Sequence, residues 1–210
     1  MNYYRNHITK TITAPFTMET VAKLAPRLPP GLTVTDTPYN QGVRYDNFDD
    51  NLPLDQYYAM LRTACPTPCV LIHYPEPMFD IAMHVFGRGP QEVMSWVYPA
   101  NTPRQFRLVA WWGIKPDFRK ARQPYRNPTD KRIAARIAAG EQARVYDWME
   151  VNLVKNVTKG RNGWGHPCQI PVQVMERIVQ VTSADLIIDP LPGVARPWWR
   201  QNAWECRASA

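Results

Sequence analysis

The sequence lacks long apolar runs. No apolar stretch approaches the roughly 18 to 20 residues that a membrane-spanning helix needs, and the amino-terminal stretch MNYYRNHITKTITAPF has no apolar segment of the kind found in signal peptides. These absences predict a cytoplasmic protein without a membrane partner. The 210 residues are 45% hydrophobic, which suits one globular domain with a sizeable core.

Cysteine and histidine are scarce, with four residues of each type. The cysteines are Cys65, Cys69, Cys168 and Cys206. They show no CxxC spacing and have no close pair of histidines beside them, so we expect reduced structural thiols rather than a metal site or a disulfide framework.

Acidic residues are rare in the middle of the chain. Residues 101–140 contain ten basic and two acidic residues, a local excess of eight positive charges in a chain whose net charge is +7. Aromatic residues are interleaved with the basic ones. Cations that neutralise phosphates and rings that stack on bases suit a polyanion such as nucleic acid. On charge alone, a solvated basic face that keeps the protein soluble is an equally good interpretation.

Apolar patterning predicts alternating strands and helices. Runs rich in β-branched and aromatic residues indicate five strands, and apolar residues at three- and four-residue spacing indicate four helices. The predicted strands are 31–36, 69–74, 93–98, 107–114 and 184–189, and the predicted helices are 54–64, 78–86, 130–139 and 172–181. This alternation favours an α/β sandwich with a largely parallel sheet.

Two predicted strands end in an aspartate followed by a turn. LTVTDTPY places Asp36 at the end of the first strand, and ADLIIDPLPG places Asp189 at the end of the last. In open α/β sheets, ligands bind at the carboxyl ends of the strands. Both aspartates are therefore candidate site residues.

The order of these segments resembles the β-type amino-directed DNA methyltransferases, which use S-adenosylmethionine to methylate adenine N6 or cytosine N4. In that family a catalytic Asp-Pro-Pro-Tyr loop comes first, a DNA-recognition segment follows and the cofactor motifs come last. Here DTPY resembles the catalytic loop, NTPRQFRLVAWWGIKPDF resembles the middle of phage-type members, and GHPCQIPVQVMERIVQVTSADLIIDPLPG resembles the cofactor block. The resemblance covers about residues 32–193. It implies a phage- or prophage-like protein in a bacterial or phage-infected cell, with a Rossmann-like methyltransferase sandwich whose mostly parallel sheet has helices on both faces.

The resemblance also implies roles for individual residues. Asp36 and a main-chain carbonyl at Thr37 or Pro38 would accept hydrogen bonds from the exocyclic amine of a flipped base, and Tyr39 would stack on that base. Aspartate at position 36 favours adenine N6 by family resemblance. Residues implied to bind S-adenosylmethionine are His166, Pro167, Gln169, Pro171, Asp189, Pro190 and Gly193. Residues predicted to bind double-stranded DNA, in a recognition segment of about 101–145, are Arg104, Arg107, Lys115, Arg119, Lys120, Arg122 and Arg126.

The chain departs from the family pattern at several positions. Thr37 stands where a proline is usual, and Leu191 replaces a phenylalanine. After Gly193 the expected Gly-x-Gly-Thr-Thr turn and the strand that follows it are absent, so the cofactor site is incomplete. We therefore expect a methyltransferase domain at 1–193 and an aberrant, poorly ordered tail at 194–210. The alternative function is a catalytically inactive methyltransferase relic that acts as a DNA-binding module.

The tail VARPWWRQNAWECRASA predicts a frameshift in the gene. Tryptophan has the single codon TGG, so the codons of Trp198 and Trp199 regroup to GTG, a valine codon. A one-base shift across residues 192–205 permits Gly-Ser-Gly-Thr-Thr-Leu-Val-Ala-Ala-Lys-Arg-Leu-Gly, which is the type of glycine-rich turn and helix that the family has there. Sequencing the gene should reveal, after a one-base correction, an open frame encoding a further strand that ends in Asp or Glu. A stop codon soon after the correction would contradict the prediction.

Overall fold

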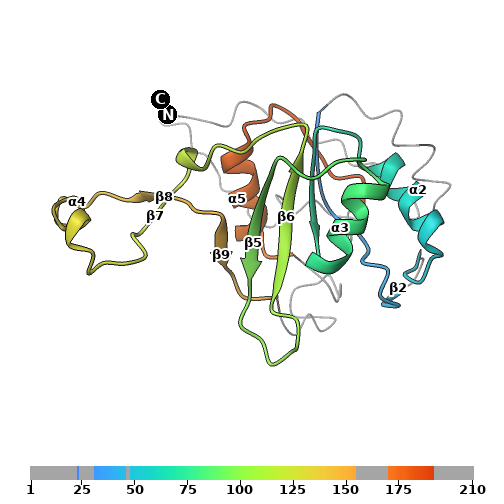
Figure 1. Cartoon of the computed structure of the whole chain (residues 1–210), viewed down its shortest axis with the longest axis horizontal. Coiled ribbons are helices and arrows are strands. Elements are labelled where there is room, and N and C mark those ends of the chain that lie inside the picture. The colour runs from blue at the N-terminus through green and yellow to red at the C-terminus, as the bar shows by residue number, and fades with distance from the viewer. Residues whose placement is uncertain (1–22, 24–30, 46–47, 155–169, 192–210) are drawn as a thin grey trace, which may run out of the picture.

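A computed structural model describes residues 23, 31–45, 48–154 and 170–191, and a mixed six-stranded sheet forms its centre (Figure 1). The strand order is β10-β1-β4-β6-β5-β9. These strands are β1 (Leu32–Asp36), β4 (Cys69–His73), β5 (Glu92–Val97), β6 (Phe106–Trp112), β9 (Trp148–Glu150) and β10 (Ile187–Ile188). Because β6 pairs antiparallel with both of its neighbours and all other pairings are parallel, five of the six strands run in one direction. The predicted mostly parallel sheet is confirmed.

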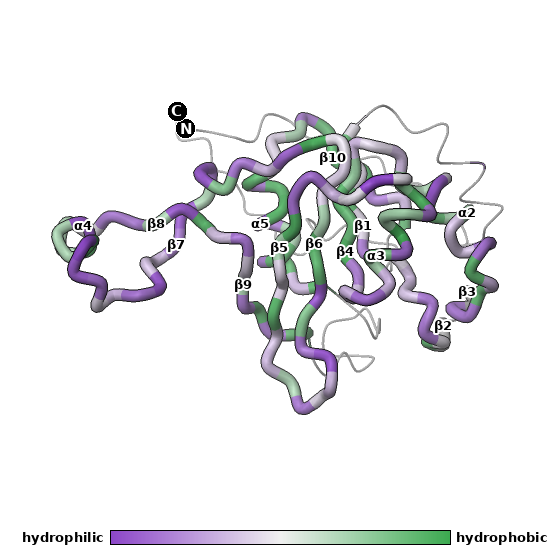
Figure 2. The backbone as a smooth tube through the Cα atoms, in the orientation of Figure 1, coloured by the Kyte–Doolittle hydropathy of each residue, from purple (hydrophilic) through white to green (hydrophobic). Residues whose placement is uncertain are grey.

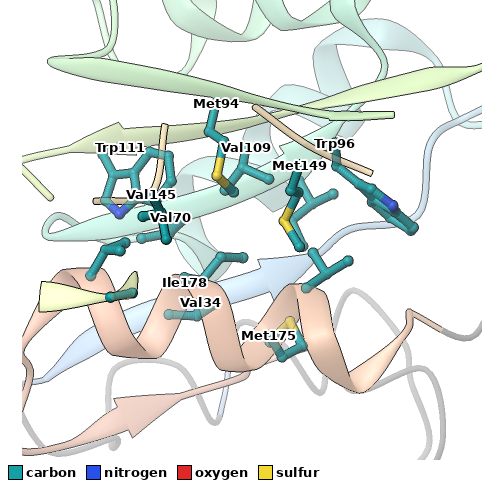
Figure 3. Packing of buried hydrophobic residues seen from close by; sticks show 14 of the residues in the cluster. Val34, Val70, Met94, Trp96, Val109, Trp111, Val145, Met149, Met175 and Ile178 are labelled. Carbon is teal, nitrogen blue, oxygen red and sulfur yellow. The ribbon is translucent and has the colours of Figure 1, made fainter. Parts of the chain in front are cut away.

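Helices cover both faces of this sheet, as predicted (Figure 1). α2 (Leu54–Ala64) and α3 (Pro75–His84) lie on one face, and α5 (Val172–Thr182) lies on the other. Figure 3 shows Met175 and Ile178 of α5 directed at the sheet, where buried valines and methionines of the strands meet them. The result is a three-layer α/β/α sandwich.

The central strands are apolar on both faces because each face is covered by helices. Trp111 and Trp112 are neighbours in β6 and are both fully buried, but strand alternation points them to opposite layers. The indole nitrogen of Trp111 donates a hydrogen bond to Thr182 Oγ1 at 3.0 Å, at the end of α5. Trp112 stacks on Phe86 with ring centroids 4.1 Å apart.

Three predicted helices are confirmed, and the fourth is confirmed over part of its length. The structure has helices at 54–64 and 172–182, and α3 begins at Pro75, where proline suits the first turn. The segment 130–139 is instead a 3₁₀ turn, η3 (Lys131–Ile133), followed by the short α4 (Ala134–Ala138). Neither element buries a residue, so no packed face extends the helix.

The residues of η3 and α4 form the end of a projecting arm, which we define as residues 122–144. Its two chains pair as the antiparallel strands β7 (Arg122–Gln123) and β8 (Ala143–Arg144), and the arm extends away from the sandwich (Figure 1). The tube in Figure 2 is largely hydrophilic along the arm. The remaining elements are β2 (Arg44–Tyr45), β3 (Phe48–Asp49) and η2 (Phe118–Lys120). In the described part of the chain, no helix is both long and apolar enough to span a membrane.

Candidate active site at the ends of the parallel strands

The two aspartates predicted from the sequence lie at one edge of the sheet. β1 ends at Asp36, and Asp189 directly follows β10, which is the parallel neighbour of β1. β4 ends at His73 on the other side of β1 and is also parallel to it. Since parallel strands have their carboxyl ends at the same edge, the side chains that follow β10, β1 and β4 meet there.

Strand β6 brings a cation to the same edge. It runs antiparallel to β4, with His73 opposite Leu108, so the start of β6 lies beside the end of β4. Arg107 alternates with Leu108 and therefore shares a face with Val109, which belongs to the core under α5. By the same alternation Asp36 follows Val34 on that face. Asp36 and Arg107 thus point to the same layer from non-adjacent strands.

The Asp36 carboxyl group is partly buried and is bonded to the loop that follows it. The Tyr39 hydroxyl donates a hydrogen bond to Asp36 Oδ1. Burial raises the pKa of Asp36 to about 7, against the lowering effects of the Arg107 charge and of the Tyr39 hydrogen bond. The side chain therefore changes charge near neutral pH, a property typical of groups that act in catalysis.

The Tyr39 ring is enclosed. It is 8% exposed, and its centroid lies 4.7 Å from the centroids of both His73 and Tyr74. The Arg107 guanidinium lies 4.8 Å from the same ring. Stacking of Tyr39 on a base, as predicted from the sequence, requires one of these neighbours to move.

Arg107, which is predicted from the sequence to bind DNA, lies within the candidate site. It is only 6% exposed, and its charge acts on Asp36 and Tyr39. Burial lowers the pKa of Arg107, but the nearby Tyr39 and Asp36 raise it by more than burial lowers it. Its pKa therefore lies above the ordinary value. We assign Arg107 to the candidate site rather than to a DNA-facing surface.

Tyr57, from α2, holds the loop that follows Asp36. Its hydroxyl donates to the Pro38 carbonyl oxygen at 2.9 Å and lies 3.0 Å from His73 Nε2. Burial lowers the pKa of His73 to about 3, so the imidazole is neutral at physiological pH. His73 is thus a structural partner of Tyr57, in keeping with its apolar strand, and Pro38 is held by a bond to its main chain.

Asp50 holds the next part of the loop and was not recognised in the sequence. It is 1% exposed, and its carboxylate accepts hydrogen bonds from the backbone amides of Asn40, Gln41 and Val43 at 2.8–3.1 Å. Asn40 has a positive φ of 54°, which its side chain supports by bonding the backbone of Leu52. The sequence offers little signal for this role, because Asp50 lies eleven residues after Tyr39 and Asp46 and Asp49 stand between them.

Thr37 carries a polar atom that the usual proline lacks. The side chain is buried, and no residue in the described part of the chain meets strict hydrogen-bond geometry with its Oγ1. The hydroxyl nevertheless lies close enough to Tyr57 that hydrogen bonding between them opposes the rise of the Tyr57 pKa. The substitution therefore places a hydroxyl beside Tyr57 and removes the fixed φ of proline.

The predicted cofactor residues are only partly described. Thr35 Oγ1 donates to Asp189 Oδ1 at 2.8 Å, and the Leu191 amide donates to the same oxygen at 3.1 Å. Burial raises the pKa of Asp189 to about 6, although these two bonds lower it. Pro171 precedes the first residue of α5 and is buried, and Pro190 is partly buried. His166, Pro167, Gln169, Gly193 and the tail 194–210 lie outside the described residues.

The remaining residues predicted to bind DNA are exposed but do not form one surface element. Arg104 lies in the β5–β6 hairpin, where its guanidinium is 4.5 Å from the Tyr74 ring and donates to Gln41 Oε1 at 3.1 Å. Lys115 follows β6, and Arg119 and Lys120 belong to η2 at the root of the arm. Arg122 and Arg126 lie in the arm itself, and Arg126 covers the Trp148 ring at 3.3 Å. The predicted recognition segment 101–145 thus comprises a hairpin, core strand β6 and the arm.

Two basic residues of the arm are already paired at its surface, because Arg132 and Arg136 form ion pairs at 2.8 Å with Asp130 and Glu141 respectively. At the root of the arm, Arg119 pairs with Asp117 at 2.8 Å. The arm nevertheless contains six basic residues against two acidic ones, an excess of four positive charges. Within the described ranges, no group of three or more histidine, cysteine or acidic side chains is arranged to hold a metal ion.

Comparison with known proteins gives a distant likeness in fold. No family model matches the sequence. No curated protein matches it either. Twelve chains of solved structures match. One of them is the crystal structure of the M1.HpyAVI–SAM complex, with a TM-score of 0.40 and 14% sequence identity over 79% of this chain and 73% of that chain.

The Tyr57 hydroxyl gives a direct test of how the loop is held. Tyr57→Phe should lower the free energy of unfolding by about 1–3 kcal/mol, because the Pro38 carbonyl and the His73 ring lose their shared partner. Tyr58→Phe is the matched control, since it removes a hydroxyl from the next residue of α2, whose ring stacks on His84. Urea unfolding of both variants measures the difference. Equal stabilities would show that Tyr57 does not anchor the loop.

Proposed function

We propose that this chain is a DNA methyltransferase that moves a methyl group from S-adenosylmethionine to the exocyclic amine of adenine (N6) or cytosine (N4) in duplex DNA. The observation that carries the proposal is the adjacency of Asp36 and Asp189 at the ends of the parallel neighbours β1 and β10. One carboxyl group belongs to the loop that resembles the catalytic motif, and the other to the turn that resembles the cofactor motif. The proposed setting is the cytoplasm of a bacterial or phage-infected cell.

The chemistry required of Asp36 follows from the poor nucleophilicity of a base amine, whose lone pair is delocalised into the ring. A flipped base brings this amine out of the duplex and into a pocket. There the Asp36 carboxylate and the Pro38 or Thr37 carbonyl oxygen would accept its N–H bonds and direct the lone pair outward. When bound, S-adenosylmethionine supplies the electrophilic methyl group. Holding the two reactants in line can contribute about 7–11 kcal/mol to the lowering of the barrier.

The described residues at the cofactor edge fit such a ligand in part. Both observed hydrogen bonds to Asp189 end on Oδ1, so Oδ2 is the oxygen that we assign to the cofactor. α5 precedes β10 and covers β1, so its amino terminus lies at the carboxyl edge of the strands, where helix amides favour the carboxylate of a bound amino acid group.

A second candidate function is a DNA-binding module without catalysis. The observation in its favour is the closed loop, in which Tyr39 is bonded to Asp36 and enclosed by three neighbours. Thermal stabilisation by S-adenosylmethionine separates the two candidates, because only a protein that binds the cofactor in its native state is stabilised by it.

Asp36→Ala should abolish transfer of a labelled methyl group from S-adenosylmethionine to duplex DNA. Alanine removes both carboxyl oxygens, so the base amine loses the side-chain acceptor of its N–H bond. Wild-type transfer should be lost as the pH falls through about 7, because the raised pKa of Asp36 makes the group neutral below that value and charged above it. Circular dichroism controls for folding. Retained transfer in a folded Asp36→Ala variant would refute the proposal.

The arm should contribute to DNA affinity through phosphate contacts. Replacing the exposed Arg122 and Arg126 by glutamine should reduce the slope of log K against log salt concentration by up to about two, since each lost phosphate contact removes about 0.9. The control variant replaces the exposed Arg62 and Arg88, which belong to the α2–α3 side of the sandwich. Fluorescence anisotropy with a labelled duplex measures both slopes. An equal slope change in the two double variants would exclude a specific role for the arm.

A further inference from the structure

We propose that Arg107 is a positioning residue that keeps the Asp36 carboxylate charged, and thereby able to accept hydrogen bonds, inside a partly buried site. The inference deepens the proposed function, because it rests on Asp36 as the acceptor of the base amine. Its own evidence is the geometry of β6, the burial of the guanidinium and the link through Tyr39.

The position of Arg107 follows from strand direction. In the ladder between β1 and β4, Asp36 lies opposite Ile72, and in the ladder between β4 and β6, His73 lies opposite Leu108. An arginine one residue before Leu108 therefore sits beside the end of β4, on the face that it shares with Asp36. A parallel β6 would have carried its first residues to the opposite edge of the sheet.

The guanidinium of Arg107 is surrounded mainly by uncharged aromatic rings. Its guanidinium is ringed by Tyr39 at 4.8 Å, Trp96 at 5.0 Å, Tyr74 at 5.5 Å and Tyr98 at 5.7 Å. Cation–π attraction to these rings offsets part of the cost of burial, but the rings carry no net charge. Arginine does not deprotonate in proteins, so a buried guanidinium needs an anion nearby. Among the described residues, Asp36 is the carboxyl group whose charge acts on Arg107.

Tyr39 joins the anion to the cation. Its hydroxyl donates to Asp36, and its ring lies over the Arg107 guanidinium. A base amine that enters the site would replace the phenol as the donor to Asp36. The negative charge of Asp36 would still be balanced by Arg107, because the guanidinium is held by three further rings.

The other charged groups around Asp36 do not supply this balance. The Asp189 carboxylate, from the end of β10, opposes the charge on Asp36. His73 is neutral, since burial lowers its pKa to about 3. Arg104 is exposed and lies over Tyr74, and it does not figure among the groups that shift the pKa of Asp36. Arg107 is thus the cation that acts on Asp36 within the described residues.

The test is a titration of Asp36 by NMR of protein labelled with ¹³C at the aspartate carboxyl carbons, with Asp36→Asn to assign the signal. Arg107→Met should move the Asp36 midpoint upward by about one pH unit or more, as expected for loss of a neighbouring opposite charge. Arg107→Lys keeps the charge and should move it less. Arg104→Met is the matched control, which removes a nearby exposed cation and should leave the midpoint unchanged.

Methyl transfer gives the second measurement. The acid limb of its pH profile should shift upward in Arg107→Met in step with the NMR midpoint, and activity should recover at higher pH. If Arg107→Met does not fold, Arg107→Gln keeps a polar head and serves in its place. An unchanged midpoint in either folded variant would overturn the role of Arg107. Absence of transfer from the wild-type protein at every pH would instead refute the proposed function, while the titration would still decide the inference about Arg107.

Discussion

The arrangement of the site depends on one constraint, which is the burial of the Asp36 carboxyl group at the end of β1. Asp36 alone would be protonated, because burial favours the neutral form. The Tyr39 hydroxyl and the Arg107 charge oppose that effect from two directions. Each needs support of its own: aromatic rings surround Arg107, and Tyr39 belongs to a loop whose main chain is bonded by Tyr57 on one side and Asp50 on the other.

Different residues determine the charge of the site and the path of the loop. The residues that set the charge of the site come from β1 and β6, which are held in the centre of the sheet by ladders on both edges. Tyr57 and Asp50 determine the path of the loop. Their side chains bond backbone atoms of the loop and not its side chains. A site built in this way changes its chemistry through a few strand residues while its loop keeps the same course.

Features determined by neighbouring residues could be read from the sequence, and those determined by distant pairings could not. The helix at 172–182 and the strand ends at Asp36 and Asp189 follow from local periodicity and turn chemistry, so they were predicted. The burial of Arg107 could not be predicted by counting charge along the chain, because it arises from the antiparallel pairing of β6 with strands on either side. The 130–139 pattern is helical in period, but no surface of the sandwich packs against it.

The narrow connection of the arm separates it from the sandwich. The strands β7 and β8 share just two residue pairs, and the buried Ala121 and Val145 that flank them belong to the main core. The end of the arm, from η3 to α4, buries no residue, so its length, charge and shape can vary without disturbing the layers that carry Asp36. Related chains that diverge should therefore accumulate insertions and substitutions at the end of the arm before they do so in the sandwich.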